Sequence, residues 1–451
     1  MKPLPPEFEE SIRNQLGSAY PAFVASLQDP PPVSIRVHPL KGKRSTTNLQ
    51  VPWAESGEYL PARPVFTLDP LFHGGSYYVQ EASSMFLEQA LSRAVDLRQP
   101  VRILDLCAAP GGKSTHILSL LNRESLLVSN DAIRSRAAIL SENIQKWGLP
   151  NTVVTNNDPA DFKKLSSFFD MVVVDAPCSG EGLFRKDHEA LTEWSPHNVQ
   201  LCAARQKRIL SDVWDALRQN GILIYCTCTY NTLENEGNLK WLNENHAVEF
   251  LDIPADPAWN IQEVNDGAIK GYQFYPHRLR GEGFFLSLIR KLEPAEQIKF
   301  RAAKNLASPP KKIQERLNDW IEMKGDNTFV QFNKLLFYTP STYFSEIEFL
   351  LQNLKIVYAG TNLATLKHDK LIPEHALGLS VELNKNNFCV SDVSQEVALK
   401  YLRKESIHLP DAPLGFSLLT FNRLPLGWVN VLPNRTNNMY PSDWRIRMSA
   451  V

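Results

Sequence analysis

Short apolar runs alternate with amphipathic stretches between residues 101 and 290. Each apolar run has the length of a buried strand, and the five runs lie at 101–106, 125–129, 152–155, 171–174 and 221–225. Apolar residues recur at intervals of three and four from Ile133 to Trp147, which predicts a helix that Gly148 ends. A second helix is predicted over 197–220, closed by Gly221, and two further strands over 271–276 and 283–290. The alternation predicts a doubly wound, Rossmann-like α/β domain with a largely parallel sheet.

The regions on either side of this α/β domain have different patterns. Residues 1–95 mix proline-rich turns with short helical and strand-like pieces, which predicts a small α+β domain. A polar stretch over 293–312 predicts a linker, and the short strands beyond it predict a β-rich module over 313–451. We therefore expect three units, at 1–95, 96–292 and 313–451, in this chain of 451 residues.

The composition is typical of a soluble globular protein, with 43% hydrophobic and 22% charged residues. No apolar run is long enough to span a bilayer, and the N-terminus does not read as a secretory signal, so we expect a cytoplasmic protein without a membrane partner. The net charge of −1 means that a nucleic-acid enzyme would have to concentrate its positive charge on one face. The six cysteines show no zinc-type pairing, so we expect reduced thiols and no metal.

The most informative segment joins the first of these strands to a helix. It reads Ile-Leu-Asp-Leu-Cys-Ala-Ala-Pro-Gly-Gly-Lys-Ser-Thr over residues 103–115, and its small side chains let a ligand approach the backbone at a helix N-terminus. A phosphate-binding loop is the first alternative, but it needs a glycine where Cys107 stands. The dinucleotide fingerprint is also absent. The segment therefore predicts one wall of a different cofactor pocket.

Carboxylates follow the next three predicted strands, at Asp131, Asp158 and Asp175. The carboxyl ends of the strands line the ligand crevice of a doubly wound sheet, so these side chains are expected there. Asp131 is placed to accept the ribose hydroxyls and Asp158 to accept from an adenine amino group. Each aspartate alone is more simply a loop or helix-cap residue, but three at successive strand ends favour an adenosyl cofactor.

Two cysteines occupy loops that meet at one mouth of the predicted sheet. Cys178 follows the fourth strand in Asp-Ala-Pro-Cys-Ser-Gly-Glu-Gly, and Cys228 follows the fifth in Cys-Thr-Cys-Thr. A buried cysteine is usually an inert hydrophobe, but polar, Gly- and Thr-flanked cysteines at a crevice favour catalysis. Methylation of cytosine at carbon 5 needs such a pair, because thiolate addition at carbon 6 makes carbon 5 nucleophilic. Asp175 suits the ring nitrogen of such a base, and Lys113 is placed to hold Asp175 or to lower a thiol pKa.

These three motifs resemble the RsmB/RsmF (Sun-domain) family of S-adenosylmethionine-dependent RNA (cytosine-5) methyltransferases. The carrying segments are Leu-Cys-Ala-Ala-Pro-Gly-Gly-Lys at 106–113, the Cys178 motif and Thr-Cys-Thr at 227–229, and the resemblance covers roughly residues 30–290. The resemblance implies that Cys228 is the nucleophile and that Cys178 assists release of the product. It implies that S-adenosyl-L-methionine is bound by Cys107, Ala108, Ala109, Pro110, Gly111, Gly112, Lys113, Asp131, Arg136, Asp158 and Asp175. Many relatives have serine at the position of Cys226, and we expect Cys226 to have a structural role.

The flanking regions are similar to the RsmF branch of this family. Residues 1–95 resemble its N-terminal domain, and 313–451 resemble its PUA-like RNA-binding module. This favours 16S ribosomal RNA, either naked or within a ribosomal subunit, as the substrate of a monomeric enzyme; a tRNA cytosine is the alternative. The candidate RNA-binding side chains are Arg185, Lys186, Arg205, Lys207, Arg208, His277, Arg278 and Arg280, although the three on the second predicted helix fit a solvated face equally well.

Two other functions compete with this interpretation. A DNA cytosine-5 methyltransferase would use Cys178 as the nucleophile and leave Cys228 idle, and the Thr-Cys-Thr motif argues against it. A non-catalytic RNA-binding assembly factor would keep the fold as a scaffold. Retention of both cysteines and Asp175 argues against loss of the site.

Overall fold

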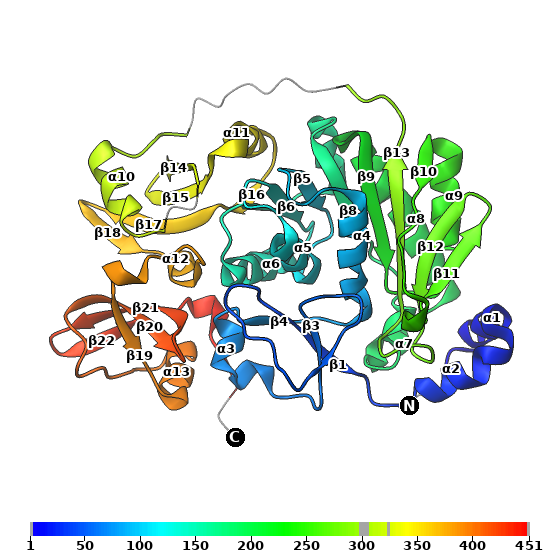
Figure 1. The fold of residues 1–451 in the computed structure, drawn as a ribbon, viewed down its shortest axis with the longest axis horizontal. Coiled ribbons are helices and arrows are strands. Elements are labelled where there is room, and N and C mark those ends of the chain that lie inside the picture. Colours follow the sequence, from blue (N-terminus) through cyan, green and yellow to red (C-terminus); the bar gives the residue numbers. More distant parts are fainter. Residues whose placement is uncertain (1–2, 297–305, 323–324, 449–451) are drawn as a thin grey trace.

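The computed structural model describes residues 3–296, 306–322 and 325–448. In these residues the chain builds one large central sheet and three smaller four-stranded sheets (Figure 1). None of the helices in these ranges is long and apolar enough to cross a membrane.

The central sheet has five parallel strands in its middle. Their order across the sheet is β9 (Leu217–Thr227), β8 (Phe169–Asp175), β5 (Arg102–Asp105), β6 (Leu126–Asn130) and β7 (Thr152–Thr155). The chain moves outward from β5 through β6 to β7 and then returns to the other side of β5 for β8 and β9. The strand order therefore reverses between β5 and β8, and ligands bind at the carboxyl ends of the strands beside such a point.

Antiparallel strands extend both edges of this sheet. Beyond β9 lie β13 (Phe284–Lys291), β12 (Ile269–Phe274) and β11 (Gln262–Asp266), with β10 (Val248–Phe250) paired to β13. On the other side, β16 (Ile356–Ala359) pairs with β7. The predicted doubly wound sheet is confirmed, and its edges make it a mixed sheet.

Both faces of the parallel strands are buried, since successive side chains enter opposite cores. Ile103, Leu127 and Val173 join one hydrophobic cluster, whereas Leu104 and Val128 join the other. The first face is covered by α4 (Leu87–Ala94), α5 (Gly112–Leu120) and α6 (Arg134–Trp147), and the second by α8 (Pro196–Val213) and α9 (Glu236–Asn245). The predicted helix over 133–147 is confirmed, and Gly148 follows it with a φ of 79°.

The helix predicted over 197–220 is wrong at its end. Helix α8 stops at Val213, a single turn follows over 214–216, and β9 begins at Leu217. Residues 217–220 carry no strong strand pattern, but Leu217 pairs with Phe169 of β8. Tertiary pairing therefore overrides the local helical preference of this segment.

The N-terminal region is a small α+β unit, as predicted. Its sheet has the order β2 (Leu49–Gln50), β3 (Gly57–Leu60), β1 (Val33–Val37) and β4 (Tyr77–Val79), and α3 is Pro70–His73. Helices α1 (Pro6–Leu16) and α2 (Tyr20–Ser26) lie apart from that sheet, to the right of it in Figure 1. They pack through Phe8 and Phe23 against Phe184, Trp194 and Tyr230, next to α7 (His188–Glu193).

The C-terminal region contains two sheets. The first has the order β14 (Asn327–Phe332), β15 (Leu335–Pro340), β17 (Thr361–Lys367) and β18 (Lys370–Pro373). The second has the order β19 (Cys389–Asp392), β20 (Gly415–Phe421), β21 (Leu424–Leu432) and β22 (Arg435–Asn438). The helices are α10 (Lys311–Asn318), α11 (Phe344–Asn353), α12 (His375–Leu379) and α13 (Gln395–Leu402). Much of the linker expected over 293–312 lies outside the described residues.

The first C-terminal sheet does not form a detached unit. Strand β16 completes the central sheet, and Phe337, Ile347 and Leu350 belong to the hydrophobic cluster that also contains Val128 of β6. The sequence pattern showed a β-rich tail but gave no sign of this pairing, because a four-residue edge strand carries too little periodicity to reveal its partner.

Deleting residues 313–451 is therefore expected to destabilise the rest of the chain. Loss of three large core side chains costs about 2–5 kcal/mol each, which lowers the unfolding midpoint by about 10 °C or more. Calorimetry of residues 1–312 beside the full chain checks this, with Leu350→Ala in the full chain as a milder change in the same direction. An unchanged midpoint in the truncated chain would contradict it.

Candidate active site

The turn after β5 is held by its neighbours along the carboxyl edge of the sheet. The Ala108 N–H donates to the Asn130 carbonyl at 2.8 Å, and the guanidinium of Arg136 donates to the Ala109 carbonyl at 2.8 Å. Gly111 has a φ of 113°, which side-chain-bearing residues rarely adopt, and it precedes α5 directly. The turn therefore presents backbone and small side chains at the strand-order reversal.

A cavity of about 280 Å³ opens beside this turn. Seven of the predicted site residues line it together: Cys107, Ala109, Lys113, Arg136, Asp175, Cys178 and Cys228. They come from the ends of β5, β8 and β9 and from α5 and α6, so residues up to about 120 positions apart in the chain form one site.

The two thiols face each other in this cavity. Cys178 Sγ and Cys228 Sγ are 3.1 Å apart, and the Cys228 N–H donates to Cys178 Sγ at 3.3 Å. Hydrogen bonding to Cys228, together with burial, raises the pKa of Cys178 well above its usual range. Cys226 is fully buried in the core, and burial raises its pKa as well, which fits an inert side chain.

A buried glutamate fixes the loop that carries Cys178. Glu234 accepts from the Ser179 N–H at 3.0 Å, from the Ser179 hydroxyl and from Gln206 Nε2 at 2.8 Å. Ser179 in turn lies 3.0 Å from the Thr229 hydroxyl, next to Cys228. No sequence pattern points to Glu234, because its role depends on two loops that meet only in the fold.

The loops also meet through Glu181 and Gly182. Glu181 accepts from Trp194 Nε1 at 2.9 Å and from the Tyr230 N–H at 3.2 Å, and burial raises the pKa of its carboxyl to about 7. A side chain at Gly182 would meet the carbonyl oxygens of Gly283 and Cys228 at 2.4 and 2.8 Å. Glycine at this position is therefore a condition for the close approach of the two cysteine loops.

Lys113 and Asp175 form an ion pair at the floor of the site. Their Nζ and Oδ2 atoms are 2.7 Å apart, and the Lys113 side chain is 11% exposed against 37% for Asp175. Burial opposes the charge on Lys113, but the attraction of Asp175 outweighs it and raises the lysine pKa. Lys113 thus remains an ammonium that orients Asp175, while the more exposed carboxylate faces the cavity.

Two of the predicted carboxylates are not among the residues that line this cavity. Asp131 is 3% exposed, accepts from the Ile133 N–H at 2.9 Å, and lies 3.5 Å from Arg136. Asp158 caps the turn after β7 and pairs with Arg208 at 3.2 Å, and its side chain is 51% exposed. Asp131 therefore adjoins the pocket through Arg136, whereas Asp158 lies further along the same edge.

The predicted basic side chains do not gather into a single face. Arg185 is 6% exposed and pairs with Glu282 at 3.0 Å, so it serves the fold. Arg208 pairs with Asp158, and Arg278 donates to Asn260 and Gln262. His277 packs against the ring of Phe23 in α2 and that of Tyr275, which follows β12. Arg205 and Lys207 lie on α8, and Lys186 and Arg280 lie by the cavities at the carboxyl edge.

Three family models match separate parts of the chain. A family described as 16S rRNA methyltransferase RsmB/F matches residues 93–290. The N-terminal domain of 16S rRNA methyltransferase RsmF matches residues 4–82, and the methyltransferase RsmF PUA domain matches 389–446. Ribosomal RNA small subunit methyltransferase F of Escherichia coli O157:H7 is 31% identical over 97% of this chain and 96% of its own length.

The chain belongs to the RsmF family of methyltransferases. The corresponding protein of Shigella boydii serotype 18 is 30% identical over the same shares of both chains. Among solved structures, NSun6 from Pyrococcus horikoshii with SFG, an S-adenosylmethionine analogue, has a TM-score of 0.54 at 21% identity. The match covers 64% of this chain and 98% of the NSun6 chain. A methyltransferase homologue from the same organism has a TM-score of 0.52 at 25% identity and covers 64% and 100%.

These relationships make the chain an S-adenosylmethionine-dependent RNA methyltransferase. The site fits this cofactor on its own chemistry. The turn over 107–112 has no bulky side chain that would block an adenosyl group, and the carboxylates of Asp131 and Asp175 suit ribose hydroxyls and a cationic sulfonium. Burial raises the pKa of Asp105, beneath the turn, to about 7 despite the hydrogen bond from Ser114. Asp105 is therefore a poorer partner for a cation than the other two.

Replacing Asp131 tests its part in holding the cofactor. Asp131→Ala is expected to weaken S-adenosylmethionine binding by about 1.5–3 kcal/mol, the scale of a hydrogen bond to a charged group. Asp131→Asn keeps an acceptor for the Ile133 N–H and so separates loss of binding from loss of the helix start. Titration calorimetry on both variants gives the result, and unaltered affinity would show that Asp131 takes no part in cofactor binding.

Proposed function

We propose that this protein methylates carbon 5 of a cytosine in 16S rRNA through a covalent adduct with Cys228. The observation that carries the proposal is the pair of thiols, 3.1 Å apart, in the same cavity as the turn after β5. A methyltransferase that acts on an already nucleophilic atom has no use for a thiol in its cavity. A methyltransferase that acts on carbon 5 of cytosine needs one, because carbon 5 becomes nucleophilic only after a thiolate adds at carbon 6.

The bond changes follow from that need. The Cys228 thiolate forms a bond to carbon 6, and the electron pair of the 5,6 double bond becomes available at carbon 5. S-adenosylmethionine supplies an electrophilic methyl group, which carbon 5 takes as the methyl–sulfonium bond breaks and S-adenosylhomocysteine leaves. A base then removes the proton from carbon 5, the double bond forms again, and the bond between Cys228 and carbon 6 breaks. Covalent catalysis thereby divides one difficult substitution into easier steps.

The burial of Cys178 and its contact with Cys228 support these roles. The raised pKa of Cys178 keeps it protonated, so its S–H can donate to the departing Cys228 thiolate 3.1 Å away. This is a role in elimination and argues against Cys178 as the attacking thiolate. Asp175, oriented by Lys113, suits the ring nitrogen of the cytosine as the adduct forms.

The flanking units fit an enzyme that acts on structured RNA. We propose that residues 1–95 and 313–451 contribute RNA-binding surface around the catalytic unit at 96–292, and that the protein acts as a monomer in the cytoplasm. The relatives named for the small-subunit RNA favour 16S rRNA over tRNA as the substrate.

Bisulfite mapping of RNA tests the proposal in cells. Ribosomal RNA and tRNA from cells with and without the gene are converted and sequenced, since 5-methylcytosine resists conversion. One 16S rRNA cytosine is expected to resist only when the gene is present, and a Cys228→Ala copy should fail to restore it. A gene-dependent cytosine in tRNA alone, or none at all, would contradict the assignment.

A further inference from the structure

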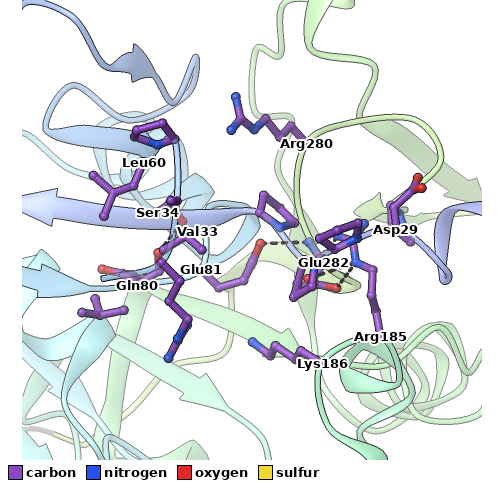
Figure 2. A pocket seen from close by; sticks show the side chains of 18 of the residues that line it. Asp29, Val33, Ser34, Leu60, Gln80, Glu81, Arg185, Lys186, Arg280 and Glu282 are labelled. Carbon is purple, nitrogen blue, oxygen red and sulfur yellow. Dashed lines mark hydrogen bonds and ion pairs between the residues drawn. The ribbon is translucent and has the colours of Figure 1, made fainter. Parts of the chain in front are cut away.

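A second, larger cavity adjoins the one that holds the thiols. It measures about 840 Å³ and lies between the N-terminal unit and the loops after β8 and β12 (Figure 2). Glu81, Lys186 and Glu282 line both cavities, so the two are neighbours along one continuous surface. In Figure 2, Leu60 and Val33 from the N-terminal unit lie on one side of the hollow, and Lys186 and Arg185 on another.

The acidic side chains shared by the two cavities are already engaged by the protein. Glu81 accepts from the Ser83 N–H at 3.0 Å and from the Glu282 N–H at 2.9 Å. The Glu282 carboxylate pairs with Arg185 at 3.0 Å. Among the residues that line the large cavity, Asp29 is the one acidic side chain without such a contact to the protein.

Three exposed cations at this cavity have no ion-pair partner among the described residues. Arg63, Lys186 and Arg280 form no ion pair with any acidic residue in the parts of the chain that the structure describes. The Arg280 guanidinium lies 4.5 Å from the centre of the Tyr59 ring, and that of Arg63 lies 5.5 Å from the Phe66 ring. Ring stacking holds both planar cations near the cavity while leaving their N–H groups free for an anion.

The walls between these cations are apolar. Pro30, Pro31, Pro32, Val33, Leu60 and Leu279 supply them. Apolar walls beside unpaired arginine and lysine match a nucleotide, which has a flat base and an anionic phosphate. A purely electrostatic groove for duplex backbone would not need the apolar surface.

We propose that this cavity binds the unpaired RNA nucleotides that directly adjoin the target cytosine. Arg63, Lys186 and Arg280 contact their phosphates, and the proline and leucine side chains pack against a base. The proposal rests on the proposed function, because a cytosine must leave its stack to reach Cys228. The thiol cavity, at about 280 Å³, is near the small end of ligand pockets, so the adjoining nucleotides must lie outside it. The large cavity is the space next to it.

The double substitution Arg63→Ala/Arg280→Ala tests the proposal, with Arg98→Ala as the matched control. Arg98 is an exposed arginine before β5, at the amino ends of the parallel strands and so away from both cavities. With an unmethylated 16S rRNA fragment containing the target, the double variant should raise the RNA Kd about tenfold or more. It should also lower the slope of log K against log salt by about 1.4, for two phosphate contacts to a single strand. S-adenosylmethionine affinity should stay unchanged. RNA affinity and salt slope equal to those of Arg98→Ala would overturn the proposal.

Trimmed RNA locates the contact. Two oligoribonucleotides end at the target cytosine, one lacking its 5′ neighbours and the other lacking its 3′ neighbours. One of the two truncations should weaken binding to the wild-type protein about tenfold and leave binding to the double variant nearly unchanged, since the lost partners are the same. Full, additive losses for both truncations would place the contact elsewhere. All these readouts are binding constants, so they remain informative if the Cys228 adduct is never found, and that result would count against the proposed function alone.

Discussion

Cys228→Ala is expected to reduce methyl transfer to RNA to background, with no protein–RNA adduct. The reason is chemical, because without attack at carbon 6 nothing makes carbon 5 nucleophilic. Transfer of a labelled methyl group to unmethylated 16S rRNA gives the measurement. S-adenosylmethionine binding should persist, since the turn after β5 and the Lys113–Asp175 pair do not depend on this thiol.

Cys226→Ala is the matched control for that experiment. Cys226 lies two positions before Cys228 but is fully buried in the core under the site. The substitution removes one sulfur without touching the cavity, so turnover should survive apart from a modest loss of stability. Substantial turnover in Cys228→Ala, or loss of turnover in Cys226→Ala with the fold intact, would contradict the assignment.

Cys178→Ala is expected to give the opposite outcome, a covalent complex that accumulates. Addition and methyl transfer precede elimination, so loss of the group that assists elimination strands the adduct. The complex should survive denaturing electrophoresis, with turnover reduced to a small fraction of the wild-type value. Cys178→Ser keeps a hydroxyl donor at the same position and should release product faster than alanine does.

The reverse pattern would exchange the two roles. Trapping by Cys228→Ala in place of Cys178→Ala would make Cys178 the nucleophile and revive the arrangement of a DNA cytosine-5 methyltransferase. Hydrogen bonding to the Cys228 thiol and burial raise the pKa of Cys178, and this argues for the first pattern.

The central sheet could be predicted from the sequence because its strands are buried on both faces. Continuous apolar runs such as 171–174 have few other uses in a chain of this composition, and the helix over 133–147 repeats its apolar face across four turns. The order of these elements then fixed the carboxyl edge as the site, since each loop that carries a motif follows a strand. The gathering of Lys113, Asp175 and the two cysteines in one cavity follows from that topology.

What the sequence did not reveal depends on contacts between distant segments. Residues 217–220 belong to β9, in which Leu217 pairs with Phe169 of β8, and β16 joins β7 from about 200 positions away. Glu234 supports the Cys178 loop from a segment with no motif of its own. The large cavity combines side chains of the N-terminal unit with Lys186 and Arg280, and the separate patterns of these segments carry no information about their distance.

The most direct test of the account is to identify the residue that is joined to RNA. The Cys178→Ala protein is incubated with S-adenosylmethionine and unmethylated 16S rRNA, and the trapped complex is digested with protease and nuclease for mass spectrometry. A methylated cytosine nucleotide is expected on the peptide that contains Cys228. A nucleotide on any other residue, or a complex that carries no covalent nucleotide, would contradict it.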